Sequence, residues 1–418
     1  MSLSKPLKIL TLNGGGLQAI STLIILDKLL KSIAQKNGAP HRKPRPCDIF
    51  DTIGGIGAGG WLAILLGRFY MDITTCLSEW YKIIRCIAPR SRSEEMRMRA
   101  FQHCYFNPDS LVEQVEYLTK EYATGEYLFD TARTDVRTRY VFVAALRSDC
   151  DDYGLFRTYD IPEAAAMPEK LREGPRDPEN FTIARAFGVT GSAKFFSPPW
   201  KEKMSKRGTT RFNDNKFPQP HNITKLALDE MWGIFGTDVP ISVIVNIGPG
   251  VPSKCDVHQI VERFSWPKRT STNSSVRSNS PISSGPAPIE SRTTSPKAPG
   301  LSVHFISRQR STKSQIPSLT RNSTFGSISD QSLRQELLKL EENIEEDIKA
   351  KLNHFYPGQE LYYRLGPEQA PLGTAQNDAT APGVALDATL KYLKMRKVGD
   401  RVDEIGGRIS EDSDRNNI

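Results

Sequence analysis

The residues of this chain that are best suited to do chemistry lie in two glycine-rich turns. The first is Asn13-Gly14-Gly15-Gly16, and the second runs from Gly54 to Gly60. Each lies between a short apolar run and a helical pattern. Such turns bring backbone N–H groups and a helix N-terminus to one point, where negative charge is stabilised. The turns therefore predict a site for an anion, either a phosphate or an oxyanion.

A nucleotide phosphate matches these turns poorly. Neither turn has the G-x-G-x-x-G pattern with an acidic residue at the end of the next strand in a clear βαβ unit. Neither has the Lys-Ser/Thr pair of a phosphate-binding loop. An oxyanion is the better interpretation.

The elements that must position the turns alternate between strand and helix. Apolar runs at Leu7–Leu12 and Ile49–Gly54 precede the turns, and helical patterns at 17–32 and 61–66 follow them. The further strand candidates are Tyr140–Ala145 and Ile241–Ile247. This alternation favours a mainly parallel sheet covered by helices on both faces. The predicted fold class is α/β.

One tract accounts for the basic character of the chain. The sequence has 418 residues, a formal net charge of +8, 38% hydrophobic residues and a mean hydropathy of -0.43. Between Pro267 and Arg321, nine basic residues stand against the single acid Glu290, among many Ser, Thr, Pro and Asn residues. A basic excess can indicate nucleic acid or an anionic membrane, but this segment has too few apolar residues to fold. We interpret it as a disordered linker.

An amphipathic helix is predicted beyond this linker. Ser332 and Gln335 form a capping-box pattern, followed by one apolar stripe on a charged helix. The stripe consists of Leu333, Leu337, Leu340, Ile344, Ile348 and Leu352. Because an isolated helix of this kind is marginal in water, we expect it to pack on the main domain. A self-associating coiled coil is the weaker alternative, since the stripe covers under three heptads.

The predicted organisation therefore has four parts. Residues 1–265 form the main domain, and residues 266–330 form the disordered Ser/Pro-rich linker. Residues 331–398 form a C-terminal helical extension that packs on the main domain. Residues 399–418 are polar without an evident period, and we expect a disordered tail.

The cysteines and the amino terminus indicate an ordinary reduced protein. The six cysteines are scattered, with no C-x-x-C pair and no histidine at zinc-ligand spacing. We therefore expect free thiols, no metal and no cofactor. The first residues lack the plan of a signal peptide, and no apolar run approaches the roughly 18 residues that span a bilayer. A cytoplasmic location is expected.

Five stretches of the chain together resemble one known family. They are Asn13–Ala19, Phe50–Gly60, Ala184–Pro199, Phe212–Asn215 and Val243–Gly250. In order and spacing they resemble the patatin-like phospholipases, whose pattern is D-G-G-G-x-R-G, then G-x-S-x-G, then D-G-G/A. The resemblance covers about Leu7 to Gly250.

The resemblance implies a three-layer α/β/α fold and a role for each motif. In the family a serine on the strand-to-helix turn attacks a lipid ester, an aspartate acts as its base, and the first loop holds the oxyanion. Carried over, the oxyanion loop is Gly14, Gly15 and Gly16. The nucleophile turn is Gly55, Ala58 and Gly59, around position 57, and the dyad aspartate is Asp214.

The departures from the family pattern decide the expected activity. Gly57 occupies the nucleophile position and has no side chain to attack with. Asn13 replaces the acid of the loop, Gln18 replaces its arginine, and Asn215-Lys216 replaces the small residues after Asp214. Loss of the nucleophile costs a serine hydrolase on the order of 10⁶ in turnover. Conventional hydrolysis by a Ser-Asp dyad is therefore not expected.

Substitute nucleophiles are poorly supported by the sequence. Thr190 and Ser192 lie in the stretch before the dyad aspartate, but no strand runs directly into a glycine-flanked turn there. A helix cap or a turn is the simpler role for both hydroxyls. His103, His221 and His258 are too scattered to indicate a triad.

Two hypotheses for the function follow. The first is an inactive patatin-like domain in lipid metabolism, retained to bind a lipid or acyl group or to interact with another protein. The alternative is an active lipid acyl hydrolase that uses a water held by Asp214 or a non-standard nucleophile. The expected partners are a lipid or acyl-ester ligand and, by peripheral contact, a membrane, with no nucleic acid. The oligomeric state stays open.

Overall fold

The computed structural model describes residues 5–88, 91, 93–94, 107–130, 136–148, 150, 152–192, 200–204, 208–213, 222–250, 330–367 and 381–414. Contacts divide the chain into two units, one of residues 1–265 with 329–418 and one of residues 266–328. The second unit, and with it the predicted linker up to residue 329, lies outside the described residues. All helices and strands named below belong to the first unit.

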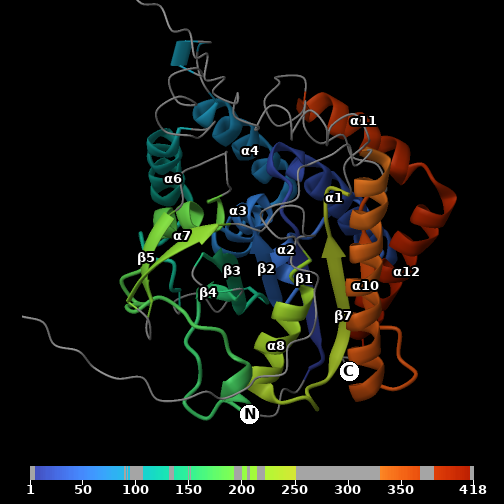
Figure 1. The fold of residues 1–418 in the computed structure, drawn as a ribbon. Helices are drawn as coiled ribbons and strands as arrows, with labels where there is room; N and C mark the ends of the chain where they lie inside the picture. The colour runs from blue at the N-terminus through green and yellow to red at the C-terminus, as the bar shows by residue number, and fades with distance from the viewer. Residues whose placement is uncertain are drawn as a thin grey trace, which may run out of the picture. The chain divides into compact units, whose positions relative to one another are not determined.

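One eight-stranded mixed sheet runs through the first unit (Figure 1). Its strands are β1 (Leu7–Leu12), β2 (Thr52–Ile56), β3 (Tyr140–Arg147), β4 (Tyr153–Arg157), β5 (Trp200–Met204), β6 (Gly208–Asn213), β7 (Ile241–Ile247) and β8 (Tyr362–Leu365). Their order is β5-β6-β3-β2-β1-β7-β8, with β4 also paired to β3. The neighbours from β3 to β8 pair in parallel, whereas β4, β5 and β6 make antiparallel pairs.

Helices connect and cover these strands. They are η1 (Gly16–Gln18), α1 (Ala19–Lys36), α2 (Pro46–Ile49), α3 (Ala58–Ala63), η2 (Ile64–Arg68), α4 (Ile73–Ile87), α6 (Pro108–Tyr122), η4 (Pro168–Lys170), α7 (Ile183–Thr190), α8 (Thr224–Phe235), α10 (Asp330–Phe355), α11 (Ala381–Leu393) and α12 (Arg396–Asp414). The second glycine-rich turn thus joins β2 to α3, and the first joins β1 to η1 and α1.

Successive residues of the central strands face two different cores. In β1, Leu10 and Leu12 belong to the core that contains α1, α3 and α4, whereas Leu7 and Ile9 belong to the core that contains α8 and α10. Side chains alternate between the faces of a strand, so helices on both faces bury nearly every strand residue. The predicted α/β fold with a mainly parallel sheet is confirmed.

The second strand begins later than its apolar run predicts. Residues 46–49 form α2, which begins with a proline, and Asp48 accepts the backbone N–H of Arg45 at 3.2 Å. Proline at the first helical position and an acid two residues later both favour a helix start. The predicted strand at 49–54 is therefore displaced to 52–56.

The C-terminal extension contributes a strand as well as helices. α10 packs Ile348 and Leu352 into the core shared with α8. The chain then adds β8 to the sheet beside β7. Arg364 of β8 donates hydrogen bonds to Glu341 and Glu345 of α10, each at 2.7 Å. A purely helical extension was an incomplete prediction.

The prediction of a disordered tail is wrong for residues 399–414, which belong to α12. Val398, Val402, Ile405 and Ile409 of this helix are all buried. Their spacings of four, three and four residues place them on one helical face. The many charges between these positions mask the period in the sequence.

Ile405→Ala is expected to lower the free energy of unfolding by about 2–4 kcal/mol, because the isoleucine side chain is fully buried. Urea unfolding measures this change. Asp400→Ala, at an exposed position of the same helix, is the control and is expected to change stability by under about 0.5 kcal/mol. Equal stability of the two variants would show that α12 is not docked.

Candidate functional site

Gly57 forms the turn between β2 and α3. Its backbone angles are φ 58° and ψ -132°, a region that side-chain-bearing residues enter only with strain. Gly57 caps α3, and its carbonyl accepts the N–H groups of Gly60 at 2.9 Å and Trp61 at 3.2 Å. The strand thus passes into the helix through one residue. This is the arrangement of a nucleophile elbow, with glycine at its apex.

Thr190, the last residue of α7, holds this turn in place. Its buried hydroxyl accepts the N–H of Gly57 at 3.0 Å and donates to the carbonyl of Ala144 in β3 at 2.7 Å. A Cβ at Gly60 would lie 2.4 Å from the same hydroxyl, so α3 and α7 are in close contact. Since the hydroxyl already donates and accepts, it positions the turn and is poorly placed to act as a nucleophile.

Thr190→Val is expected to lower the free energy of unfolding by about 1–3 kcal/mol, because a buried N–H and a buried carbonyl lose their partner while the shape is kept. Hydrogen exchange at the Gly57 amide is the specific measurement, and exchange should become faster. Thr190→Ser keeps the hydroxyl and should keep the protection. Unchanged exchange in the valine variant would contradict this role.

The first glycine-rich loop lies directly beside this turn, because β1 and β2 are paired and end at the same edge of the sheet. A Cβ at Gly59 would lie 2.2 Å from the carbonyl oxygen of Leu12 and 2.5 Å from that of Asn13. A Cβ at Gly15 would lie 2.2 Å from the ring of Pro249, which follows β7. Close approach of three chain segments therefore requires glycine at both positions.

A buried amide network ties the loop to β7. Asn13 and Asn246 exchange two side-chain hydrogen bonds, of 3.0 and 2.9 Å. Asn246 also donates to the hydroxyl of Thr11 at 2.9 Å, and that hydroxyl lies 3.0 Å from the hydroxyl of Thr224. An amide at position 13 can donate to Asn246 and accept from it, whereas an ionised acid could only accept. The asparagine at position 13 is thus matched by its surroundings.

Gln18, at the position of the family arginine, is fully buried at the end of η1. Both polar atoms of its side chain lack a hydrogen-bond partner among the described residues. The same holds for the hydroxyl of Thr22, one turn later in α1. Buried polar groups without partners cost about 1–3 kcal/mol each. Gln18 and Thr22 therefore leave buried donors and acceptors unsatisfied at the end of the glycine-rich loop.

Ser192, the other candidate hydroxyl, closes the end of α7. Its Oγ donates to the carbonyl of Gly188 at 2.6 Å and accepts the N–H of Trp200 at 3.0 Å. Both contacts are internal to the fold. Ser192 is therefore in the capping role that the sequence favours for it.

Asp214, the expected dyad aspartate, lies outside the described residues. The strand before it, β6, ends at Asn213, which pairs with Leu146 near the end of β3. Ile56, the residue before Gly57, pairs with Ala144 of the same strand. The chain that leads to Asp214 thus reaches the edge of the sheet at which the elbow lies.

Asn246 was not singled out by the sequence as part of the site. It is the only amide in the strand ISVIVNI, whose other residues are apolar except Ser242. A lone amide in a buried parallel strand signals an internal hydrogen-bond partner. That partner, Asn13, lies more than 200 residues earlier in the sequence, so the strand alone cannot identify it.

A cavity of about 410 Å³ lies away from the glycine turns. Its lining includes Tyr140 at the start of β3 and Tyr159 just after β4, at the opposite edge of the sheet from Gly57. Arg68 and Asp130, which also line it, form a buried ion pair at 3.0 Å. These charges stabilise each other, and the cavity contains none of the motif residues.

Metal and membrane-spanning features are absent from the part of the chain that the structure describes. No group of three or more His, Cys, Asp and Glu side chains in it could hold a metal ion. No helix in it combines the length and the apolar character needed to cross a bilayer.

Comparison with known proteins gives one significant sequence match. No family model matches the chain. A stretch of 89 residues is 33% identical to "Patatin-like phospholipase 1" of Plasmodium falciparum (isolate NF54). Part of the chain is similar to a patatin-like phospholipase. The match covers 21% of this chain and 13% of the Plasmodium protein, so most of that protein has no counterpart in the match.

Comparison with solved structures gives a match of low structural similarity. The crystal structure of VipD from Legionella pneumophila matches 62% of this chain and 52% of its own, with 11% sequence identity and a TM-score of 0.27. A TM-score this low does not establish a common fold.

Proposed function

We propose that this chain is a patatin-like domain that has lost its nucleophile and is retained to bind a lipid or an acyl group. The observation that carries this proposal is Gly57 at the apex of the turn from β2 into α3. The backbone there has the shape of a nucleophile elbow, but glycine has no hydroxyl to attack an ester. The covalent step is lost while the frame around it is kept.

The frame favours an oxygen-bearing ligand. Gly14, Gly15 and Gly16 lead into η1, and Ala58 and Gly59 begin α3. The first N–H groups of a helix have no partner within it, and they stabilise a carboxylate or a carbonyl oxygen. A fatty acid or an acyl ester could place its oxygen atoms there, in the space that the family's serine would occupy.

Equilibrium binding of a fluorescent fatty acid, below its micelle concentration, tests this proposal. We expect one saturable site in the natural protein. The Gly57→Ser variant tests where the fatty acid binds. A fluorophosphonate should label its new hydroxyl, and saturation with the fatty acid should slow that labelling. Absence of binding, or binding that leaves the labelling rate unchanged, would overturn the proposal.

The alternative is an active lipid acyl hydrolase in which Asp214 holds an attacking water. Glycine at position 57 leaves room for such a water, and the loop could still polarise a carbonyl. Steady turnover that depends on Asp214 would favour this alternative.

A further inference from the structure

We infer that the corner between α11 and α12 is a docking surface for an anionic membrane. The corner consists of residues 390–397, at the end of α11 and the start of α12. From Leu390 to Gly399 the sequence has four cationic residues and no acid. They are Lys391, Lys394, Arg396 and Lys397, and all four are exposed.

Two large apolar side chains stand exposed among these cations. Leu390 is 44% exposed and Met395 is 47% exposed. Apolar side chains within a basic surface are typical of segments that lie in the headgroup region of a bilayer. The apolar groups enter the interface while the cations meet anionic headgroups.

The acidic partners of Lys391 and Arg396 do not cancel the charge of these two cations. Lys391 pairs with Asp387 at 2.8 Å, and Arg396 lies 3.8 Å from Asp400. Every side chain in both pairs is at least 66% exposed, and ion pairs this exposed contribute little. Both basic groups can therefore turn to a headgroup at low cost.

The corner is a fixed projection of the fold. Backbone hydrogen bonds close it from Lys394 to Leu390 and from Met395 to Tyr392. The Tyr392 hydroxyl accepts the N–H of Gly366 at 3.1 Å, just after β8, and Val398 is buried on the other side. The backbone of the corner is thus fixed before binding, so docking does not have to order it.

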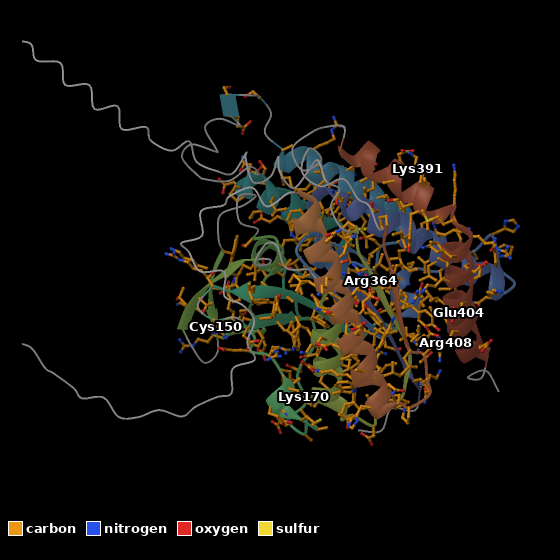
Figure 2. All side chains as sticks on the ribbon, turned by 45° about the vertical axis from the view of Figure 1, so that its right-hand side comes forward. Cys150, Lys170, Arg364, Lys391, Glu404 and Arg408 are labelled. Carbon is orange, nitrogen blue, oxygen red and sulfur yellow. The ribbon has the colours of Figure 1, made fainter. Side chains whose placement is uncertain are left out.

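The corner and the glycine turns are linked through α1. Thr389 of α11 donates to the hydroxyl of Ser21, and Ser21 donates to the carbonyl of Ala385. Ser21 lies in the first turn of α1, just after the glycine-rich loop and η1. α11 lies at the end of the sheet to which the β7 arrow points, where the elbow also lies (Figure 1). Lys391 lies at this same end (Figure 2).

This placement fits a bilayer as the partner. A protein that takes up a lipid or an acyl group gains from contact with a membrane at the edge that holds the site. This inference therefore rests on the proposed function for its purpose, although the docking surface itself is independent of it. Acidic protein surfaces could attract the cations, but they would not draw Met395 into an acyl environment.

Sedimentation of the full chain with phosphatidylcholine vesicles, with and without phosphatidylserine, tests the surface. Neutralising Lys391, Lys394, Arg396 and Lys397 to glutamine is expected to weaken binding to the anionic vesicles on the order of 1000-fold, at about 1 kcal/mol for each basic residue. The matched control changes four exposed lysines elsewhere to glutamine: Lys28, Lys36, Lys201 and Lys203. Both variants keep the basic tract at 267–321 and carry the same net charge, so the control should lose far less of its affinity for the anionic vesicles. Equal losses in the two variants would overturn the inference.

A second measurement reports insertion directly. Met395→Trp should gain a blue-shifted emission and quenching by brominated acyl chains on anionic vesicles. Vesicle-bound protein without quenching would overturn the inference. The proposed function is judged separately by fatty-acid binding without vesicles, which the corner variant should keep. A chain that docks through the corner but binds no fatty acid would retain this inference and lose the proposed function.

Discussion

Gly57→Ser is expected to turn this chain into an ester hydrolase. The new hydroxyl would stand at the apex of the elbow, beside the oxyanion loop and within the frame that Thr190 holds. A nucleophile in an intact serine hydrolase contributes on the order of 10⁶ to turnover. Because Asn13 and Gln18 depart from the family pattern, we expect a smaller gain, at least about 100-fold in kcat/KM for a short-chain nitrophenyl ester.

The same substitution should destabilise the fold. The backbone of Gly57, at φ 58° and ψ -132°, costs a residue with a side chain about 1–3 kcal/mol. Gly57→Ala is the matched control, with the same strain and no hydroxyl, and it should lose stability without gaining activity. Adding Asp214→Ala to the serine variant should abolish the gain. A folded serine variant with no activity would show that the frame is no longer a working elbow.

Gly59→Ala is expected to lower the free energy of unfolding by about 3–5 kcal/mol, at the upper end for a single methyl group. The added Cβ would lie 2.2 Å from the carbonyl oxygen of Leu12. That oxygen belongs to the backbone at the end of a central strand, so no change of rotamer relieves the clash. Urea unfolding followed by circular dichroism measures the loss.

Gly125→Ala is the matched control for this experiment. A Cβ at Gly125 would meet nothing within 4 Å, so its effect should stay within about 0.5 kcal/mol. Any folded Gly59→Ala protein would have its two glycine turns moved apart, and its fatty-acid affinity should fall. Similar stability of the two variants would contradict the close approach of the turns.

Strands buried on both faces were the most predictable elements. β1 and β7 run from Leu7 to Leu12 and from Ile241 to Ile247, as their apolar runs predict. Central strands of a parallel sheet contact helices on both sides, so nearly every residue is apolar and the ends of the run mark the ends of the strand. β2 was displaced because a short helix with its own capping signals uses the first residues of that run.

The C-terminal part was harder to predict. β8 is only four residues long and joins the sheet beside a strand more than 100 residues earlier. A strand this short leaves no periodic signal that a sequence window can detect. α12 does carry a regular apolar spacing, but its charged residues hide the period unless the positions are counted.

The candidate site was predictable as motifs and not as contacts. The glycine patterns indicated two strand-to-helix turns, and the pairing of β1 with β2 in the structure makes these turns neighbours. The bond from Gly57 to Thr190 spans 133 residues, and nothing local in the sequence marks the threonine as its partner. The sequence predicts a helix cap or a turn for Thr190, whereas in the structure its hydroxyl holds the turn at Gly57.

The central claim is that Gly57 leaves a binding frame without a covalent step. The most direct test measures ester and phospholipid hydrolysis by the purified natural protein and by its Asp214→Ala variant. We predict that both proteins show only the background rate of the buffer while the natural protein still binds the fatty acid. Turnover by the natural protein that disappears in Asp214→Ala would contradict it, and would assign the chain to hydrolases that act through a water held by that aspartate.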